Sequence, residues 1–112
     1  MPSDSKEILP GTLDLMVLKT LDTMGPTHGY GIAQRIVSIS DGILQLNQGS
    51  LYPALLRMEQ RGWIRSEYGL SENNRQARFY SLTAAGRKRL TTEAANWMQM
   101  VAIMTRLLAA TE

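Results

Sequence analysis

The chain has 112 residues, a common size for a single domain that leaves little room for two separate cores. Its 12 Lys and Arg residues against 10 Asp and Glu residues give a net charge of +2, and cysteine is absent. A disulfide framework is therefore excluded, and with His28 as the only histidine we expect neither a metal site nor another cofactor. No run approaches the roughly 18 apolar residues of a membrane span, and the N-terminus lacks a signal-like apolar segment. We expect a cytoplasmic protein that does not bind a membrane.

Basic residues concentrate between positions 60 and 89. Seven Arg and Lys residues stand against two Glu residues there, a local excess of five positive charges. This clustering favours nucleic acid as a partner over an ordinary solvated basic face.

The first predicted helix follows a polar leader at positions 1–8. It begins near Thr12, a suitable N-cap, and ends at Gly25, which precedes a proline. Leu15 and Leu18 lie off its main apolar stripe, which comprises Leu13, Met16, Val17, Leu21 and Met24. The helix is therefore either fully internal or in contact with a second subunit through Leu15 and Leu18.

The second predicted helix, at positions 28–40, follows Thr27 as its N-cap and packs through Ile32, Ala33, Ile36 and Val37. Gly29 and Gly31 lower its helix propensity, which indicates a close neighbour or an approach to the backbone. His28 is expected to make local hydrogen bonds at the helix start, with catalysis as the remote alternative. A turn with a short extended piece at 43–46 follows.

The third predicted helix begins near Gly49 and packs through Leu51, Leu55 and Met58. Pro53 then falls in about its first turn, where backbone N–H groups lack helical partners, and the amides around Ser50 and Leu51 are free to meet a phosphate. Outward-facing residues of this helix are Gln48, Ser50, Tyr52, Pro53, Leu56, Arg57 and Gln60.

From Gly62 the apolar period changes from helical to alternating. The stretches 63–69 and 78–83 predict two strands, with Ile64, Tyr80 and Leu82 facing the core and a polar, Asn- and Arg-bearing tip between them.

Thr83 is the predicted N-cap of a last helix at 83–110. Its apolar residues recur at alternating spacings of four and three, which is the seam of a coiled coil: Leu90, Ala94, Trp97, Val101, Met104 and Leu108. Met100, Ile103 and Leu107 widen the stripe. We expect this helix to pair with a second copy of itself; the alternative is that it folds back onto its own domain.

Three helices, a β-hairpin and a long helix, in this order, describe a mostly α fold with a small β-hairpin. It is a winged helix-turn-helix domain followed by a long C-terminal dimerisation helix. In such a domain Ser50 and Tyr52 can donate to phosphates, and Gln48 and Arg57 can reach base edges. A half-buried packing ring is the alternative for Tyr52, and a solvated charge for Arg57. In the hairpin, Arg78 has firmer support than Arg75 for a phosphate contact.

Four stretches resemble the PadR family of transcriptional regulators: LPGTLDLMVLKTL, HGYGIAQRI, QGSLYPALLRMEQRGWI and RFYSLTAAGRKRL. They cover residues 9–90, and the single helix after the hairpin is similar to the family's short-chain subgroup. The resemblance implies a bacterial, cytoplasmic homodimer, usually a repressor that leaves its double-stranded operator when a small aromatic or phenolic effector binds. It implies DNA contacts at Ser50, Tyr52 and Arg78, and an interface in which the first helix packs on the partner's last helix.

The resemblance also implies effector stacking on Trp97, and Met100 and Met104 are adaptable neighbours for a flat ligand. The expected domains are then a DNA-binding domain at 9–82 and a dimerisation helix at 83–112. The wing tip, NNRQA, lacks the basic character common in that family, so fewer phosphate contacts are expected. The competing function is a protein-interaction module that does not read DNA. An enzyme is not expected, because no nucleophile, metal or phosphate motif is present.

Overall fold

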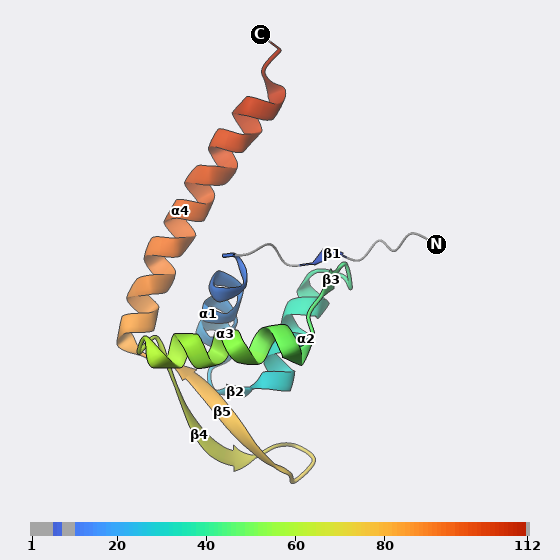
Figure 1. Ribbon diagram of the computed structural model, residues 1–112, viewed down its shortest axis with the longest axis vertical. Coiled ribbons are helices and arrows are strands. Elements are labelled where there is room, and N and C mark those ends of the chain that lie inside the picture. Colours follow the sequence, from blue (N-terminus) through green and yellow to red (C-terminus); the bar gives the residue numbers. More distant parts are fainter. Residues whose placement is uncertain (1–5, 8–10, 112) are drawn as a thin grey trace.

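The computed structural model describes residues 6–7 and 11–111, and Figure 1 shows their arrangement. Along the chain the elements are β1 (Lys6–Glu7), α1 (Leu13–Met24), β2 (Thr27–His28), α2 (Gly29–Ile39), β3 (Leu44–Gln45), α3 (Gln48–Gln60), β4 (Ile64–Leu70), β5 (Gln76–Leu82) and α4 (Ala84–Ala109). The expected mostly α fold with one hairpin and a long last helix is confirmed.

The core lies where α1, α2 and α3 meet the base of the hairpin. The expected packing of α3 is confirmed, because Leu51, Leu55 and Met58 are fully buried. Leu18 lies off the main apolar stripe of α1, and none of its surface is exposed in the single chain. The internal-helix alternative is therefore correct for Leu18, since α2, α3, α4 and β5 all contact α1 in its own chain.

Two small sheets complete the fold. β2, β5 and β4 form an antiparallel sheet in that order, with β4 and β5 in register from Ile64 opposite Leu82 to Leu70 opposite Gln76. We call β4, β5 and the loop 71–75 between them the wing. The predicted leader, 1–8, falls outside the described residues except for β1, which pairs in parallel with β3.

Polar caps set the helix starts. The Thr83 side chain accepts a hydrogen bond from the amide of Gly86, as predicted for α4. The prediction of Thr27 as the cap of α2 is wrong: His28 Nδ1 accepts from the amide of Gly31 at 3.0 Å. Thr27 instead pairs with Tyr80 in the sheet, a long-range contact that local capping preferences do not include.

Pro53 is the sixth residue of α3, because the helix begins at Gln48 after the cap Asn47. It therefore lies beyond the first turn, and it withholds one helical hydrogen bond from the carbonyl of Gly49. The predicted first-turn placement is wrong by about half a turn, since the helix starts earlier than the glycine that marked its expected beginning.

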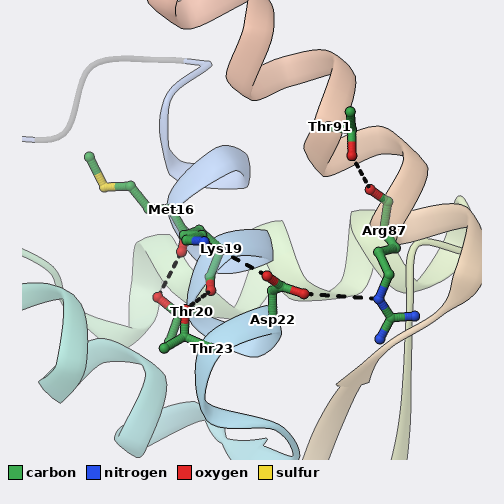
Figure 2. Close-up of polar contacts among 7 residues, drawn as sticks. All are labelled: Met16, Lys19, Thr20, Asp22, Thr23, Arg87 and Thr91. Atoms are coloured by element: carbon green, nitrogen blue, oxygen red, sulfur yellow. Dashed lines mark hydrogen bonds and ion pairs between the residues drawn. The ribbon is translucent and has the colours of Figure 1, made fainter.

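The start of α4 is fixed to the domain. Thr83 Oγ1 donates to the carbonyls of Gly62 and Trp63, and Leu90 is buried in the core. Figure 2 shows a second attachment, an ion pair between Asp22 of α1 and Arg87 of α4. Asp22 Oδ1 lies 3.9 Å from Arg87 Nε. Beyond this base α4 leaves the domain, and every residue from 95 to 111 is exposed (Figure 1).

Candidate nucleic-acid interface

Helix α3 lies across the domain with one long side in solvent, above the wing in Figure 1. A helix placed in this way in a winged helix-turn-helix is the recognition helix, the one that enters the major groove. Four of the residues that were predicted to contact DNA belong to this helix, and all four are exposed: Gln48, Ser50, Tyr52 and Arg57.

The N-terminus of α3 is already capped by its own chain. Asn47 Oδ1 accepts from the amide of Ser50 at 2.9 Å, and the amide of Leu51 donates to the carbonyl of Asn47 at 3.1 Å. The expectation that these two amides are free for a phosphate is therefore wrong. The Ser50 hydroxyl stays exposed beside them.

Tyr52 lies against the start of α2. A β-carbon at Gly29 would be only 2.7 Å from its hydroxyl oxygen, so the phenol lies against the bare backbone there. The residue is still 42% exposed. The ring thus packs against α2, in keeping with the packing-ring alternative, while part of the residue stays on the surface; a phosphate contact of its hydroxyl stays a prediction.

The wing faces α3 with one row of side chains. Residues alternate along a strand, so Ser66, Tyr68 and Arg78 share the face that holds Ile64 and Tyr80. Arg78 donates to Ser66 Oγ at 2.8 Å and to Tyr68 Oη at 2.9 Å, and its guanidinium lies 4.6 Å from the Tyr68 ring. Ser66 in turn donates to Glu59 of α3 at 2.6 Å.

This chain of contacts holds the Arg78 guanidinium in one place. The hydrogen bond that the Tyr68 oxygen accepts raises the pKa of the Arg78 guanidinium. The arginine stays exposed while two hydrogen bonds define its direction. A charge presented in this way suits a phosphate oxygen, because little side-chain entropy remains to be lost on contact.

The wing tip is a compact turn. The amide of Ser71 donates to the carbonyl of Arg75 at 2.8 Å, and Asn74 adopts a left-handed φ of 59°, which asparagine tolerates better than most residues. Arg75 follows this turn with an exposed side chain. The tip therefore offers one cation at its end.

Arg57 is engaged within its own domain. Its guanidinium forms an ion pair with Asp14 at the start of α1. This contact connects α3 to α1 and competes with the predicted base contact of Arg57, which stays a prediction. Both partners are partly exposed, so the pair adds at most about 1 kcal/mol to stability.

The local excess of basic charge is divided between several surfaces. The guanidinium carbons of Arg61, at the end of α3, and Arg89, on α4, lie 5.3 Å and 4.7 Å from the centre of the Trp63 ring. Arg87 pairs with Asp22, whereas Arg75 and Arg78 remain on the wing. The basic footprint is therefore smaller than the sequence count indicates.

Helix α4 presents a long apolar surface beyond the domain. Its exposed large apolar side chains are Trp97, Met98, Met100, Val101, Ile103, Met104, Leu107 and Leu108. Of the predicted seam, Leu90 is buried in its own domain and Ala94 is half-buried. Isolated soluble domains rarely leave so contiguous an apolar stripe in water.

A groove of about 870 Å³ lies between α1, the end of α2 and the base of α4. Its lining is mostly apolar and includes Leu15, Ile36, Ile39, Trp97 and Met98. Of the predicted effector residues, only Trp97 lines this groove; Met100 and Met104 lie exposed on α4 outside it.

Within the described residues, no helix is long and apolar enough to cross a membrane.

Sequence reasoning missed several residues that build this site. Glu59, Ser66 and Tyr68 orient the wing arginine, and Asp14 holds Arg57. The alternation of the strands could have placed Ser66 and Tyr68 on the core-side face. Their pairing with Arg78 needed the register of the hairpin, which the length of the loop sets.

Together these features define a winged helix-turn-helix domain with an appended, solvent-exposed helix. The chain belongs to the PadR-like family of transcriptional regulators, whose family model matches residues 17–92. It is thus a transcriptional regulator of a family that is not enzymatic.

Solved structures agree with this assignment. A transcriptional regulator from Clostridium thermocellum is 27% identical, with a TM-score of 0.77 over 86% of this chain and 92% of that one. A PadR family regulator from Clostridium difficile is 28% identical, with the same TM-score of 0.77 over 88% of this chain and 100% of that one. Among proteins compared by sequence alone, a 37.1 kDa protein in transposon TN4556 of Streptomyces fradiae is 44% identical over 70 residues. These residues are 62% of this chain and 19% of that protein.

Proposed function

We propose that this regulator is a homodimeric repressor that binds a two-fold operator through α3 and the wing, and that a small aromatic effector releases it. The observation that carries the proposal is the Glu59–Ser66–Arg78 chain of hydrogen bonds. It joins the recognition helix to the wing and holds Arg78 as an exposed cation. Glu59, where the chain of contacts begins, lies seven residues after the exposed Tyr52 and so on the same side of α3.

In this proposal α3 enters the major groove. Gln48 reaches base edges from the first turn, while Ser50 and Tyr52 donate to phosphates beside it. Arg78 and Arg75 contact phosphates on the flank of the groove. Arg57 is left out of the DNA contacts because Asp14 holds it.

The proposed dimer uses the exposed stripe of α4. The spacing of a two-helix seam is followed by Ala94, Trp97, Val101, Met104 and Leu108. Ala94 is half-buried, and the exposure of the other four in a single chain supports a second copy as their partner. Leu15 is half-buried beside this seam and can join it. Leu18 and Leu90 are left out of the interface, because the core of their own domain covers them. The domain boundary then falls at Thr83, with 9–82 as the DNA-binding part and 83–112 as the dimerisation part.

The proposed effector site lies at Trp97. Its ring is 44% exposed at the edge of the apolar groove, so a flat ligand can stack on it. A ligand held between α1 and α4 changes the angle between the domain and the dimerisation helix. Release from DNA follows, because both recognition helices must keep the spacing of the two half-sites.

The alternative is an interaction module that does not read DNA. Two exposed leucines favour it, Leu56 on α3 and Leu70 on the wing, which are 57% and 67% exposed on the surface proposed to meet DNA. Such apolar residues suit a protein partner better than a phosphate backbone.

A gel-shift titration separates the two functions. The duplex spanning the gene's own upstream region is compared with a duplex of equal length and base composition from within the gene, each at several salt concentrations. We expect the upstream duplex to shift at a lower protein concentration and both to weaken with salt. Equal shifts at every salt concentration, together with a protein that copurifies without nucleic acid, would favour the interaction module.

A further inference from the structure

Gly29 lies under the phenol of Tyr52. It is the first residue of α2 and is buried, and a β-carbon there would lie 2.7 Å from Oη, 3.0 Å from Cζ and 3.1 Å from Cε1 of that tyrosine. Real β-carbons essentially never come within 2.7 Å of another heavy atom, and 3.0–3.1 Å is tighter than most of their contacts. Any larger residue at position 29 therefore displaces the Tyr52 ring.

The backbone does not require glycine at this position. Gly29 is absent from the residues with positive φ, so its conformation is one that other residues adopt as readily. In a helix, glycine is also less favourable than alanine by up to about 1 kcal/mol. The space above its α-carbon is what distinguishes glycine here from alanine.

That space decides where the phenol lies. Tyr52 precedes Pro53, whose fixed φ stiffens this part of α3, and its ring extends from α3 to the start of α2. The hydroxyl is the far end of the side chain, so a clash there moves the ring and leaves the core intact. A displaced ring carries its hydroxyl away from the position at which it meets a phosphate.

We propose that Gly29 is a positioning residue for operator binding, which acts by leaving the space that the Tyr52 phenol occupies. The proposal rests on the proposed DNA contact of Tyr52. It assigns to the glycine of the sequence HGYG a role in recognition that the packing of α2 alone does not require.

A double-mutant cycle tests the proposal. Operator affinity is measured by fluorescence anisotropy for the wild type, Gly29→Ala, Tyr52→Ala and the double variant, and each protein is also melted. We expect each single variant to bind about tenfold more weakly and the double variant to bind no more weakly than Tyr52→Ala, because the added methyl group then has no ring to displace. The double variant should also melt at or above the temperature of Gly29→Ala, which shows the relief of the clash even if that single variant is unstable.

Gly31→Ala is the matched control. Its β-carbon would meet Thr27 Cγ2 at 2.9 Å and His28 Cε1 at 3.3 Å, so it strains the start of α2 without touching Tyr52. We expect it to shift the melting temperature while operator affinity stays within about twofold of the wild type.

Two results would overturn the proposal while the DNA contact stands: Gly29→Ala binding like the wild type, or Gly29→Ala weakening the Tyr52→Ala protein by the same factor as the wild type. If Tyr52→Ala binds like the wild type, the contact of Tyr52 is itself wrong and the role of Gly29 ends with it.

Discussion

Glu59 accepts a 2.6 Å hydrogen bond from Ser66, which fixes the end of the recognition helix to the first strand of the wing. A carboxylate close to a surface that meets DNA would by itself repel phosphates. Its contact explains its presence, because Ser66 is also the acceptor for Arg78. The acidic residue thus places the basic one.

We predict that Glu59→Ala weakens operator binding about threefold, the equivalent of one lost hydrogen bond, although it removes a negative charge from the interface. Glu59→Gln retains an oxygen that accepts from Ser66 and should bind at least as well as the wild type. If electrostatics alone governed the effect, both variants would bind more tightly. Anisotropy titrations of the two variants at one salt concentration distinguish these outcomes.

Arg78→Ala should weaken binding to specific and unrelated duplexes by a similar factor and reduce the salt slope of binding by about one ion. The reason is that a phosphate contact positions the protein without reading sequence. Arg65 lies on the opposite face of β4, so Arg65→Ala is the matched control of equal charge change. If Arg78→Ala leaves the salt slope unchanged, or if Arg65→Ala weakens binding by the same factor, Arg78 does not contact DNA.

Val101→Glu should convert the dimer to a monomer, because it buries an unpaired carboxylate in the proposed seam. Sedimentation velocity is the measurement. Gln99 is exposed on the outer side of α4 by the heptad spacing, so Gln99→Glu adds the same charge outside the seam and should remain dimeric. A Val101→Glu protein that sediments like the wild type would show that α4 pairs through another face or not at all.

Planar aromatic compounds should quench the fluorescence of Trp97, whose ring is 44% exposed at the groove. Trp63, which lies close to the guanidinium groups of Arg61 and Arg89, supplies the background signal. Trp63→Phe should keep the ligand-dependent change and Trp97→Phe should lose it. If Trp97→Leu, which has no ring, binds the compound with unchanged affinity by calorimetry, stacking on Trp97 has no part in effector binding.

Most of the fold could be predicted from local patterns. The stripe of α3, the alternation of Ile64, Tyr80 and Leu82, and the Thr83 cap all rest on interactions within a few residues, and the structure confirms them. The predictions that failed did so because of long-range packing, which local patterns do not show. Thr27 is taken from its cap by pairing with Tyr80, and Leu18 is buried because several elements surround α1.

The candidate site was less accessible from the sequence. The exposure of Tyr52 follows from helical periodicity. Strand alternation instead puts Arg78 on the face that holds Ile64 and Tyr80, so it does not predict the exposure of Arg78. The contacts that hold the two side chains are not local either: Gly29 is 23 positions from Tyr52, and Arg78 meets Ser66 and Tyr68 only in the register of the folded hairpin. Arg57 shows the converse, since a partner 43 positions away occupies a side chain that periodicity alone leaves free.

The central claim is that a homodimer binds its operator sequence-specifically. The most direct test is to measure binding of the purified protein to three labelled duplexes: the footprinted operator, the operator with one half-site shuffled, and a fully shuffled duplex. We predict two protomers per operator, a loss of at least about tenfold when one half-site is shuffled, and only salt-sensitive residual binding to the third duplex. Equal affinity for all three duplexes at every salt concentration would contradict sequence-specific binding by a dimer.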